Sequence, residues 1–295
     1  MNIVIPTYNR HYDYNINFLN SFEKFCLDKN DVKINFIVNS EEFDLFKNLK
    51  NQFTNLNVNI IKLNNLLQVI DNKSYSDSAS NFSTKYSLQS IKKLLAYNSV
   101  DTDYIVLDSE NLCLKEFYFK DIFNTLKNKK LLYCNETYQG IQKEVILNCN
   151  NLINFSNTKW FFVKSYWFYE KKIVNQLILH LKQIHNSDIT TLLSDKIFFE
   201  YQLYCTFLLK NNTKETICCD TIYDKDYSFR VDLDTIKGNY EYIALVLNEE
   251  NVEHYINTLN ELDERIVRLH WMNESIKNKI VEKTSVCIGT FHWDQ

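Results

Sequence analysis

Two acidic residues separated by one position follow an apolar run near the middle of the chain. The run is DYIVL at 103–107, and the acidic residues are Asp108 and Glu110. If the backbone stays extended beyond the run, both side chains point the same way and their charges repel. Burying such a pair is costly unless a cation compensates for the charge. The pattern therefore predicts a site for Mg²⁺ or Mn²⁺, ions that prefer oxygen ligands and share their coordination shell with substrate phosphates. The simpler alternative is a strand that runs out into a solvated turn.

The elements that would position these residues alternate along the first half of the chain. Apolar runs typical of strands occupy 2–6, 33–38, 58–63 and 103–107. The last run is almost wholly apolar, as expected for a strand buried on both faces of a sheet. Apolar residues at helical spacing lie between the runs, at Ile16, Leu19, Phe22 and Cys26 and then within 41–49 and 86–98. This alternation predicts an α/β fold with right-handed crossovers and a mainly parallel sheet flanked by helices.

The second half of the chain is less regular. Strand-like runs lie at 130–134, 159–163, 215–224 and 240–248, and helical patterns lie at 169–184, 195–210 and 251–262. No internal repeat and no linker rich in Gly, Pro or Ser interrupts the chain, so no domain boundary is predicted.

Four strand ends are expected to share one edge of the predicted sheet. In open parallel sheets, ligands bind beyond the carboxyl ends of the strands. The segments that follow the four predicted strands are IPTYNR, NSEE, the Ser- and Asn-rich loop from 71 to 84, and DSEN. The sequence therefore predicts that these segments form one ligand site.

Composition limits the remaining possibilities. A formal net charge of -4 gives no electrostatic reason to expect nucleic acid as a partner. The eight cysteines form no CxxC pair, and the adjacent Cys218 and Cys219 have no neighbouring His or Cys that would complete a zinc site. We therefore expect free thiols in a reducing compartment. The start of the chain lacks the features of a signal peptide, and no run approaches 18 apolar residues, so we expect a cytoplasmic protein.

NIVIPTYNR at the start of the chain and DYIVLDSEN about a hundred residues later together resemble the nucleotide-sugar-dependent glycosyltransferases of the GT-A fold. The resemblance implies a Rossmann-type sheet and a divalent ion, Mn²⁺ or Mg²⁺, held against the donor diphosphate at an Asp-x-Asp position. Asp108 and Glu110 occupy the two acidic places, with Glu in place of the second Asp. The nucleotide-sugar side of the site is implied to include Pro6, Thr7, Tyr8, Arg10, Asn39, Glu41 and Ser109.

Two further segments resemble an uncharacterised bacterial glycosyltransferase-like family. LQSIKKL at 88–94 is similar to its Gln-x-x-x-Lys-Leu helix, and FEYQLYCTF at 199–207 is similar to its Ser-Glu-Tyr-Glu-Leu-Tyr-Gly segment. The second match holds at Glu200, Tyr201, Leu203 and Tyr204 and departs at Phe199, Gln202 and Cys205. The combined resemblance covers residues 1 to 210 and leaves the tail uncovered.

Three further residues receive roles from this resemblance. Lys93 is expected to contact a phosphate, although a solvated helix lysine is the alternative. Glu200 is expected to act as general base, because an apolar helix would partly desolvate its carboxylate and raise its pKa; the alternative is an exposed glutamate. A third metal ligand from the C-terminal region is expected at His292, with His270 as second choice, and the alternative is an ordinary surface or core histidine.

The implied activity is transfer of a sugar from a nucleotide-sugar donor to a glycan or lipid-linked acceptor in bacterial surface polysaccharide biosynthesis, such as that of capsule or lipopolysaccharide. Residues 1–295 would form a single GT-A-like domain, with a donor-binding half at 1–130 and a more irregular acceptor-binding half at 131–295. A lipid-linked acceptor would bring the protein to the inner face of the membrane. Two alternatives stay open. The first is a nucleotidyl- or phosphotransferase, which would usually have a Gly-rich loop where IPTYNRHYDY has no glycine. The second is a non-catalytic protein that binds a glycan or a partner, which would be compatible with Glu110 in place of the second Asp.

Overall fold

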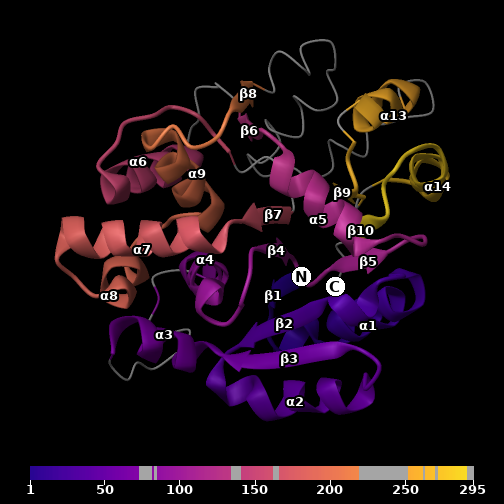
Figure 1. Ribbon diagram of the computed structural model, residues 1–295, viewed down its shortest axis with the longest axis horizontal. Coiled ribbons are helices and arrows are strands. Elements are labelled where there is room, and N and C mark those ends of the chain that lie inside the picture. The colour runs from indigo at the N-terminus through magenta and orange to yellow at the C-terminus, as the bar shows by residue number, and fades with distance from the viewer. Residues whose placement is uncertain are drawn as a thin grey trace.

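A five-stranded sheet forms the centre of the molecule in the computed structural model, which describes residues 1–72, 82, 85–133, 141–161, 166–218, 252–261, 263–269 and 272–290 (Figure 1). The strand order is β3-β2-β1-β4-β7. Parallel pairing joins the first four strands, and β7 pairs with β4 in the antiparallel direction. The strand bounds are β1 Asn2–Pro6, β2 Lys33–Val38, β3 Asn57–Lys62, β4 Tyr104–Leu107 and β7 Tyr166–Tyr169.

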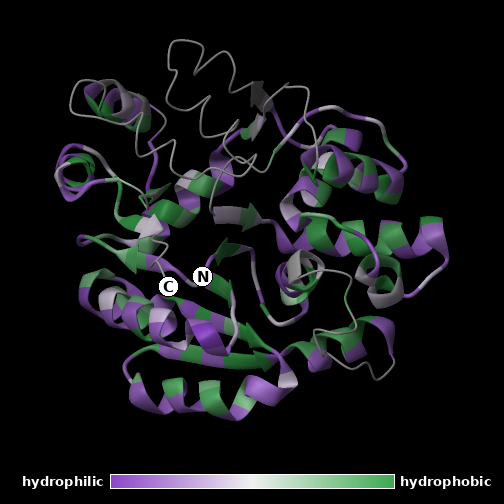
Figure 2. Cartoon of the chain, turned by 180° about the vertical axis from the view of Figure 1, so that it is seen from behind, coloured by the Kyte–Doolittle hydropathy of each residue, from purple (hydrophilic) through white to green (hydrophobic). Residues whose placement is uncertain are grey.

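The sheet is buried on both faces because its inner strands are apolar at almost every position. Successive side chains of a strand point to opposite faces. Accordingly, Ile3 and Ile5 of β1 pack into one apolar cluster, whereas Val4 packs into another. In Figure 2 the central strands carry mostly hydrophobic colour, while the outer helices show mixed colour. This double burial is what a parallel α/β sheet requires.

Helices cover the two faces unequally. The first face is covered by α1 (Tyr12–Phe25), α2 (Phe43–Gln52) and α5 (Phe119–Asn128). The second face carries a larger helical layer, formed by α3 (Leu63–Asp71), α4 (Lys85–Leu95), α6 (Ile141–Ile153), α7 (Lys171–His185), α8 (Ile189–Ser194) and α9 (Glu200–Lys210). Within this layer α4 contacts β1, α8 and α9. Helix α4 therefore connects the sheet to the second half of the chain.

Two smaller sheets complete the described structure. One has the order β5-β10-β9, from Asn111–Cys113, Ile288–Thr290 and Ile266–Arg268, and it carries the last apolar cluster together with α13 (Val252–Glu261) and α14 (Glu274–Lys283). The other pairs β6 (Leu131–Tyr133) with β8 (Thr216–Cys218). Strand β5 begins directly after the acidic segment, so the first small sheet places a C-terminal strand beside that segment.

The predicted fold class is confirmed: a mainly parallel sheet is flanked by helices, and the four predicted strands end at one edge. Free buried thiols are confirmed at Cys26, Cys113, Cys149, Cys205 and Cys287, whereas Cys134 and Cys219 lie outside the described residues. None of the helices in the described part of the chain combines the length and apolar character needed to cross a bilayer.

Some predicted elements of the second half are wrong. The helix predicted at 195–210 begins only at Glu200. Serine hydroxyls bind the carbonyls that precede it: Ser87 donates to the carbonyl of Lys196, and Ser90 donates to that of Phe198. Of the strand predicted at 159–163, residues 159–161 form no strand, and 162–163 lie outside the described residues. The start of the helix predicted at 169–184 belongs to strand β7, and α7 begins at Lys171. The predicted strand at 240–248 and most of that at 215–224 lie outside the described residues.

A chain of buried amides fixes how the first three strands align. Asn59 Nδ2 donates to Asn35 Oδ1 at 3.1 Å, and Asn35 Nδ2 lies 3.3 Å from Asn2 Oδ1. The chain ends where Asn2 Nδ2 donates to Asp101 and Thr102. Because a shift of one residue would move these amides to the other face of the sheet, the chain favours a single register.

We predict that Asn35→Val lowers the free energy of unfolding by about 1–3 kcal/mol, because it leaves buried amide groups of Asn2 and Asn59 without their partner. Urea unfolding followed by circular dichroism measures the change. Asn59→Val, at the half-buried end of the chain of amides, is the matched control and should cost less. Equal costs would contradict the central role of Asn35.

Candidate functional site

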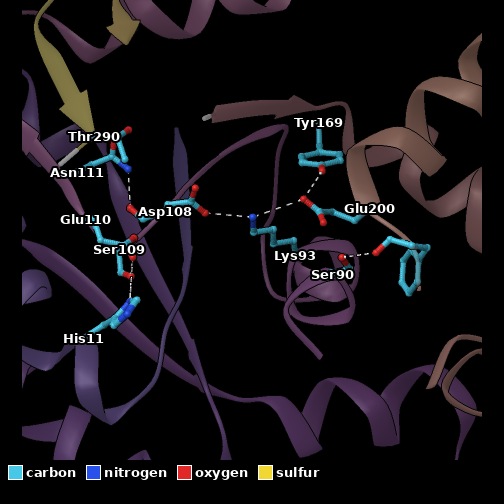
Figure 3. A network of polar contacts seen from close by, with 11 residues as sticks. His11, Ser90, Lys93, Asp108, Ser109, Glu110, Asn111, Tyr169, Glu200 and Thr290 are labelled. Atoms are coloured by element: carbon cyan, nitrogen blue, oxygen red, sulfur yellow. Dashed lines mark hydrogen bonds and ion pairs between the residues drawn. The ribbon is translucent and has the colours of Figure 1, made fainter. Parts of the chain in front are cut away.

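The candidate site lies where β1 and β4 end side by side. Successive strands of the first half extend the sheet from β1 in one direction, and β4 is added on the other side of β1. This arrangement is a topological switch point, the usual place for ligands in open α/β sheets. The segment after β1 and the acidic segment after β4 border it, and α4 approaches from the helical layer (Figure 3).

Lys93 of α4 is the centre of the site. Its Nζ lies 3.1 Å from Asp108 Oδ1 and 3.6 Å from Glu200 Oε1 (Figure 3). The centroid of the Trp167 ring lies 3.8 Å from the same atom. The side chain is only 6% exposed. Burial acts against the ammonium charge, but the carboxylates of Asp108 and Glu200 outweigh burial, and the pKa of Lys93 is raised. The lysine is therefore a buried cation.

The preceding lysine reaches the other strand end. Lys92 Nζ donates to the carbonyl oxygen of Thr7, the first residue after β1, at 2.8 Å. Because the two lysines are neighbours on α4, one helix turn is tied both to the end of β1 and to the end of β4. The predicted alternative, in which Lys93 is a solvated helix residue, is wrong.

Glu200 is the first residue of α9 and is also buried. Its side chain is 2% exposed, and its Oε1 faces both Lys93 and the hydroxyl of Tyr169, the latter at 3.5 Å. Burial raises the pKa of the Glu200 carboxyl more than the Lys93 ammonium lowers it. The predicted desolvation is confirmed, and the alternative of an exposed glutamate is wrong. Its role as a general base stays a prediction.

The acidic segment turns away from the strand instead of extending it. Strand β4 ends at Leu107, and a turn follows at Ser109 and Glu110. The prediction that an extended backbone points Asp108 and Glu110 the same way is therefore wrong. Asp108 faces Lys93, whereas Glu110 lies near His11, with 3.5 Å between Glu110 Oε1 and His11 Nδ1. The turn gives each carboxylate its own partner.

Glu110 is held in a small polar cluster with Ser109 and His11. The Ser109 hydroxyl lies 3.2 Å from Glu110 Oε2, and it also forms a short hydrogen bond with His11 Nδ1 (Figure 3). The His11 ring packs between Tyr8 and Tyr14, with centroid distances of 4.1 and 5.2 Å. Burial, together with repulsion from Asp108, raises the pKa of the Glu110 carboxyl to about 7. His11 was not among the predicted site residues; its only signal in the sequence is its place directly after IPTYNR.

The other predicted residues differ in how deeply they are buried. Pro6 ends β1 and is buried; the Thr7 hydroxyl accepts a hydrogen bond from Asn15 and is 1% exposed. Arg10 and Glu41 are exposed. The structure thus gathers Lys93, Asp108, Ser109, Glu110 and Glu200, and it buries the Thr7 side chain against Asn15.

The end of β2 lies beside the end of β1. Asn39 is 6% exposed, and its Oδ1 has no hydrogen-bond partner among the described residues. Glu42, which the sequence did not single out, accepts a hydrogen bond from the backbone of Asn9 at 2.8 Å. The segments after β1 and β2 are therefore joined, and Asn39 offers an unused acceptor next to them.

The C-terminal strand is tied to the acidic turn. The Asn111 amide donates to the carbonyl of Asp108 at 2.6 Å, and its Oδ1 accepts the hydroxyl of Thr290 at 2.8 Å (Figure 3). Both Asn111 and Thr290 are buried. His292 and His270, the predicted third ligands, lie outside the described residues.

A divalent ion fits part of this arrangement. Within the ranges that the structure describes, no three His, Cys, Asp or Glu residues are grouped so as to hold a metal ion. Asp108 and Glu110 nevertheless supply carboxylate oxygens at this strand end. Mg²⁺ commonly binds one or two carboxylates and completes its shell with water and substrate phosphates. Asp108 and Glu110 are the residues that would hold such an ion.

Fold and site together define a doubly wound α/β protein with a cluster of charged residues at its switch point. The chain belongs to the family described as "Family of unknown function (DUF6492)", whose model matches residues 1–255. A comparison with curated proteins gave no match.

Solved structures similar to this chain include glycosyltransferases, the class that its motifs resemble. Mouse xyloside xylosyltransferase 1 is 10% identical, with 77% of this chain and 91% of that chain covered and a TM-score of 0.40. The glycosyltransferase GlyE of Streptococcus pneumoniae is 11% identical, with 82% and 52% covered and a TM-score of 0.42. The galactosyltransferase LgtC, in complex with donor and acceptor sugar analogues, is 11% identical, with 74% and 73% covered and a TM-score of 0.39.

We predict that Glu110→Gln stabilises the metal-free protein at pH 8 and has little effect near pH 4. An unfolded glutamate ionises above its ordinary pKa of 4.5, whereas folded Glu110 resists ionisation until about pH 7. Wild-type stability should therefore fall, relative to the variant, between these two pH values, by at most about 3 kcal/mol.

Urea unfolding in EDTA at a series of pH values measures this difference. Glu41→Gln, at an exposed glutamate, is the matched control and should show no such trend. A difference that is constant with pH would contradict burial as the cause.

Proposed function

We propose that this protein is a glycosyltransferase that moves a sugar from a nucleotide-sugar donor to a glycan or lipid-linked acceptor. The observation that carries the proposal is the convergence on α4, where Lys92 binds the backbone after β1 and Lys93 binds the acidic turn after β4. A donor diphosphate needs positive charge beside a nucleoside site, and the ends of parallel strands at a switch point offer both. The motifs IPTYNR and DSEN support the same reading.

Charge in the site supports the proposal of a divalent cofactor. The carboxylates of Asp108, Glu110 and Glu200 all act on the ammonium of Lys93. An anionic diphosphate would be repelled by this excess of negative charge. We propose Mn²⁺ or Mg²⁺ at Asp108 and Glu110, where the bound ion would offset the charge that develops on the leaving diphosphate.

His292 is proposed as a third ligand of that ion. Thr290 closes the described part of the chain, and its hydroxyl binds Asn111, which in turn holds the backbone of Asp108. The chain is thus anchored beside the acidic turn only two positions before His292. This connection supports the proposal, and it makes Asn111 the residue through which the C-terminal strand positions the turn.

The donor nucleoside is proposed to lie over the ends of β1 and β2. The half-exposed ring of Tyr8 and the exposed side chain of Arg10 are available there, and Asn39 offers an unpaired acceptor oxygen for a base or ribose donor group. Thr7 would contribute by holding the end of β1 in place, because its hydroxyl, its amide and its carbonyl already bind Asn15, Ile37 and Lys92. Glu41 is exposed at the rim of the same edge.

The acceptor is proposed to be a glycan or a lipid-linked saccharide of a bacterial surface polysaccharide. A lipid-linked acceptor would place the enzyme at the inner face of the membrane as a peripheral protein. Both proposals rest on the resemblance of the motifs.

We predict that a nucleoside diphosphate raises the melting temperature of the protein, and that Mn²⁺ increases the effect. A ligand at a concentration 100 times its Kd stabilises the folded state by about 2.7 kcal/mol. A thermal-shift screen of UDP, GDP and CMP, with Mn²⁺ or with EDTA, measures it. Asp108→Asn should abolish the part of the shift that requires Mn²⁺.

Asp103→Asn is the matched control, because Asp103 lies just before β4, at the opposite end of the strand from Asp108. This variant should keep the full shift. No shift with any of the three nucleotides, with or without Mn²⁺, would overturn the proposed function. Binding without donor hydrolysis or transfer would instead identify a non-catalytic binding protein.

We predict that Glu200→Gln lowers sugar transfer by a factor of about 10²–10⁴ at saturating donor and Mn²⁺, as expected for loss of a general base. The measurement is product formation with the donor selected by the screen. Glu200 is buried, whereas Asp108 is 28% exposed. For Glu200 to act as the general base, the acceptor hydroxyl must therefore reach a buried carboxylate. Unimpaired transfer by the variant would eliminate Glu200 as the base.

A further inference from the structure

The ammonium of Lys93 already binds Asp108, one of the two carboxylates proposed to hold the divalent ion. Lys93 Nζ lies 3.1 Å from Asp108 Oδ1 and forms a hydrogen bond with it. The lysine cannot withdraw into solvent, because its side chain is 6% exposed. A cation that binds Asp108 through Oδ1 must therefore compete with Lys93.

The structure supplies Lys93 with a second set of partners. Glu200 Oε1 lies 3.6 Å from the ammonium, and the Trp167 ring lies beneath it with its centroid at 3.8 Å. Both side chains belong to the helical layer and the antiparallel strand, not to the acidic turn. A buried ammonium needs a counter-charge, and a carboxylate with an aromatic face can provide it without Asp108.

We infer that Lys93 is a resident cation that exchanges partners: it holds Asp108 in the nucleotide-free protein and is held by Glu200 and Trp167 when Asp108 binds a divalent ion. This role deepens the proposed function and rests on it. Lys93 is thereby a positioning residue for the turn in the empty site and a phosphate contact in the filled one. Glu200 and Trp167 stabilise the buried ammonium of Lys93 when Asp108 binds the divalent ion.

The exchange has opposite effects on the binding of the divalent ion and on the binding of the nucleotide. Without nucleotide, Lys93 competes for Asp108 and weakens the binding of the divalent ion. With a nucleoside diphosphate present, the same ammonium attracts the phosphates and strengthens binding of the nucleotide. The divalent ion should therefore bind weakly to the empty protein and more tightly together with nucleotide.

Isothermal titration of Mn²⁺ into the nucleotide-free protein tests this competition. Lys93→Met should tighten Mn²⁺ binding by about tenfold or more. Lys127→Met is the matched control: Lys127 Nζ lies 3.1 Å from Asp103 Oδ2, so the variant removes the same charge from a lysine–aspartate pair at the other end of β4. It should leave the Mn²⁺ affinity unchanged.

A second pair of variants keeps the test decisive if Lys93→Met fails to fold. Glu200→Gln removes a partner of Lys93, so the lysine stays on Asp108 and Mn²⁺ binds more weakly than to wild type. Adding Lys93→Met to that background removes the competitor without leaving two facing carboxylates, and Mn²⁺ affinity should rise above that of Glu200→Gln alone. A merely structural loss would weaken binding in both steps.

Titration of UDP and GDP in the presence of saturating Mn²⁺ completes the experiment. Lys93→Met should weaken nucleotide binding by about tenfold, so that one substitution changes the two affinities in opposite directions. Equal Mn²⁺ affinities of Lys93→Met and wild type would overturn the partner exchange and leave the glycosyltransferase proposal standing. Absence of Mn²⁺ binding in every variant would overturn both the exchange and the proposed cofactor.

Discussion

Two buried charged groups, Lys93 and Glu200, and the partly exposed Asp108 can occupy their places only because they meet. Lys93, Asp108 and Glu200 come from α4, the end of β4 and the start of α9, and the two carboxylates lie 3.1 and 3.6 Å from one ammonium. A charge buried without a partner would cost several kcal/mol, so none of these elements can be displaced without exposing or isolating a charge. The contact therefore ties the helical layer to the sheet at the one edge where the strands deliver polar residues.

The rest of the fold serves to bring those groups to that edge. Apolar strands buried on both faces hold the sheet between its helical layers, and the amides of Asn2, Asn35 and Asn59 select one register. With the register fixed, the ends of β1 and β4 lie side by side. Lys92 and Lys93 then bind one end each. The site is polar because the strands stop there, and the same helix turn contacts both strand ends.

Much of the first half could be predicted from the sequence. The four parallel strands, their shared edge and the placement of Asp108 at that edge follow from local apolar runs and helical spacing, which depend on neighbouring residues alone. The second half was harder. Strand β7 was not predicted. Helix α9 begins later than its apolar pattern indicated, because the carbonyls of Lys196 and Phe198 bind Ser87 and Ser90 of α4. Such contacts join distant parts of the chain and leave no local pattern.

The sequence by itself determined the α/β alternation, the acidic pair after the fourth strand and the apolar environment of Glu200. Only the tertiary structure decided the partners of these residues. It turned Ser109 and Glu110 away from the strand, placed His11 against Glu110, and set Lys93 between Asp108 and Glu200. The physical reason is that strands and helices form from short-range patterns, whereas buried charges must be satisfied by whichever groups packing brings near them. Spacing can locate a carboxylate, but only packing can supply its counter-charge.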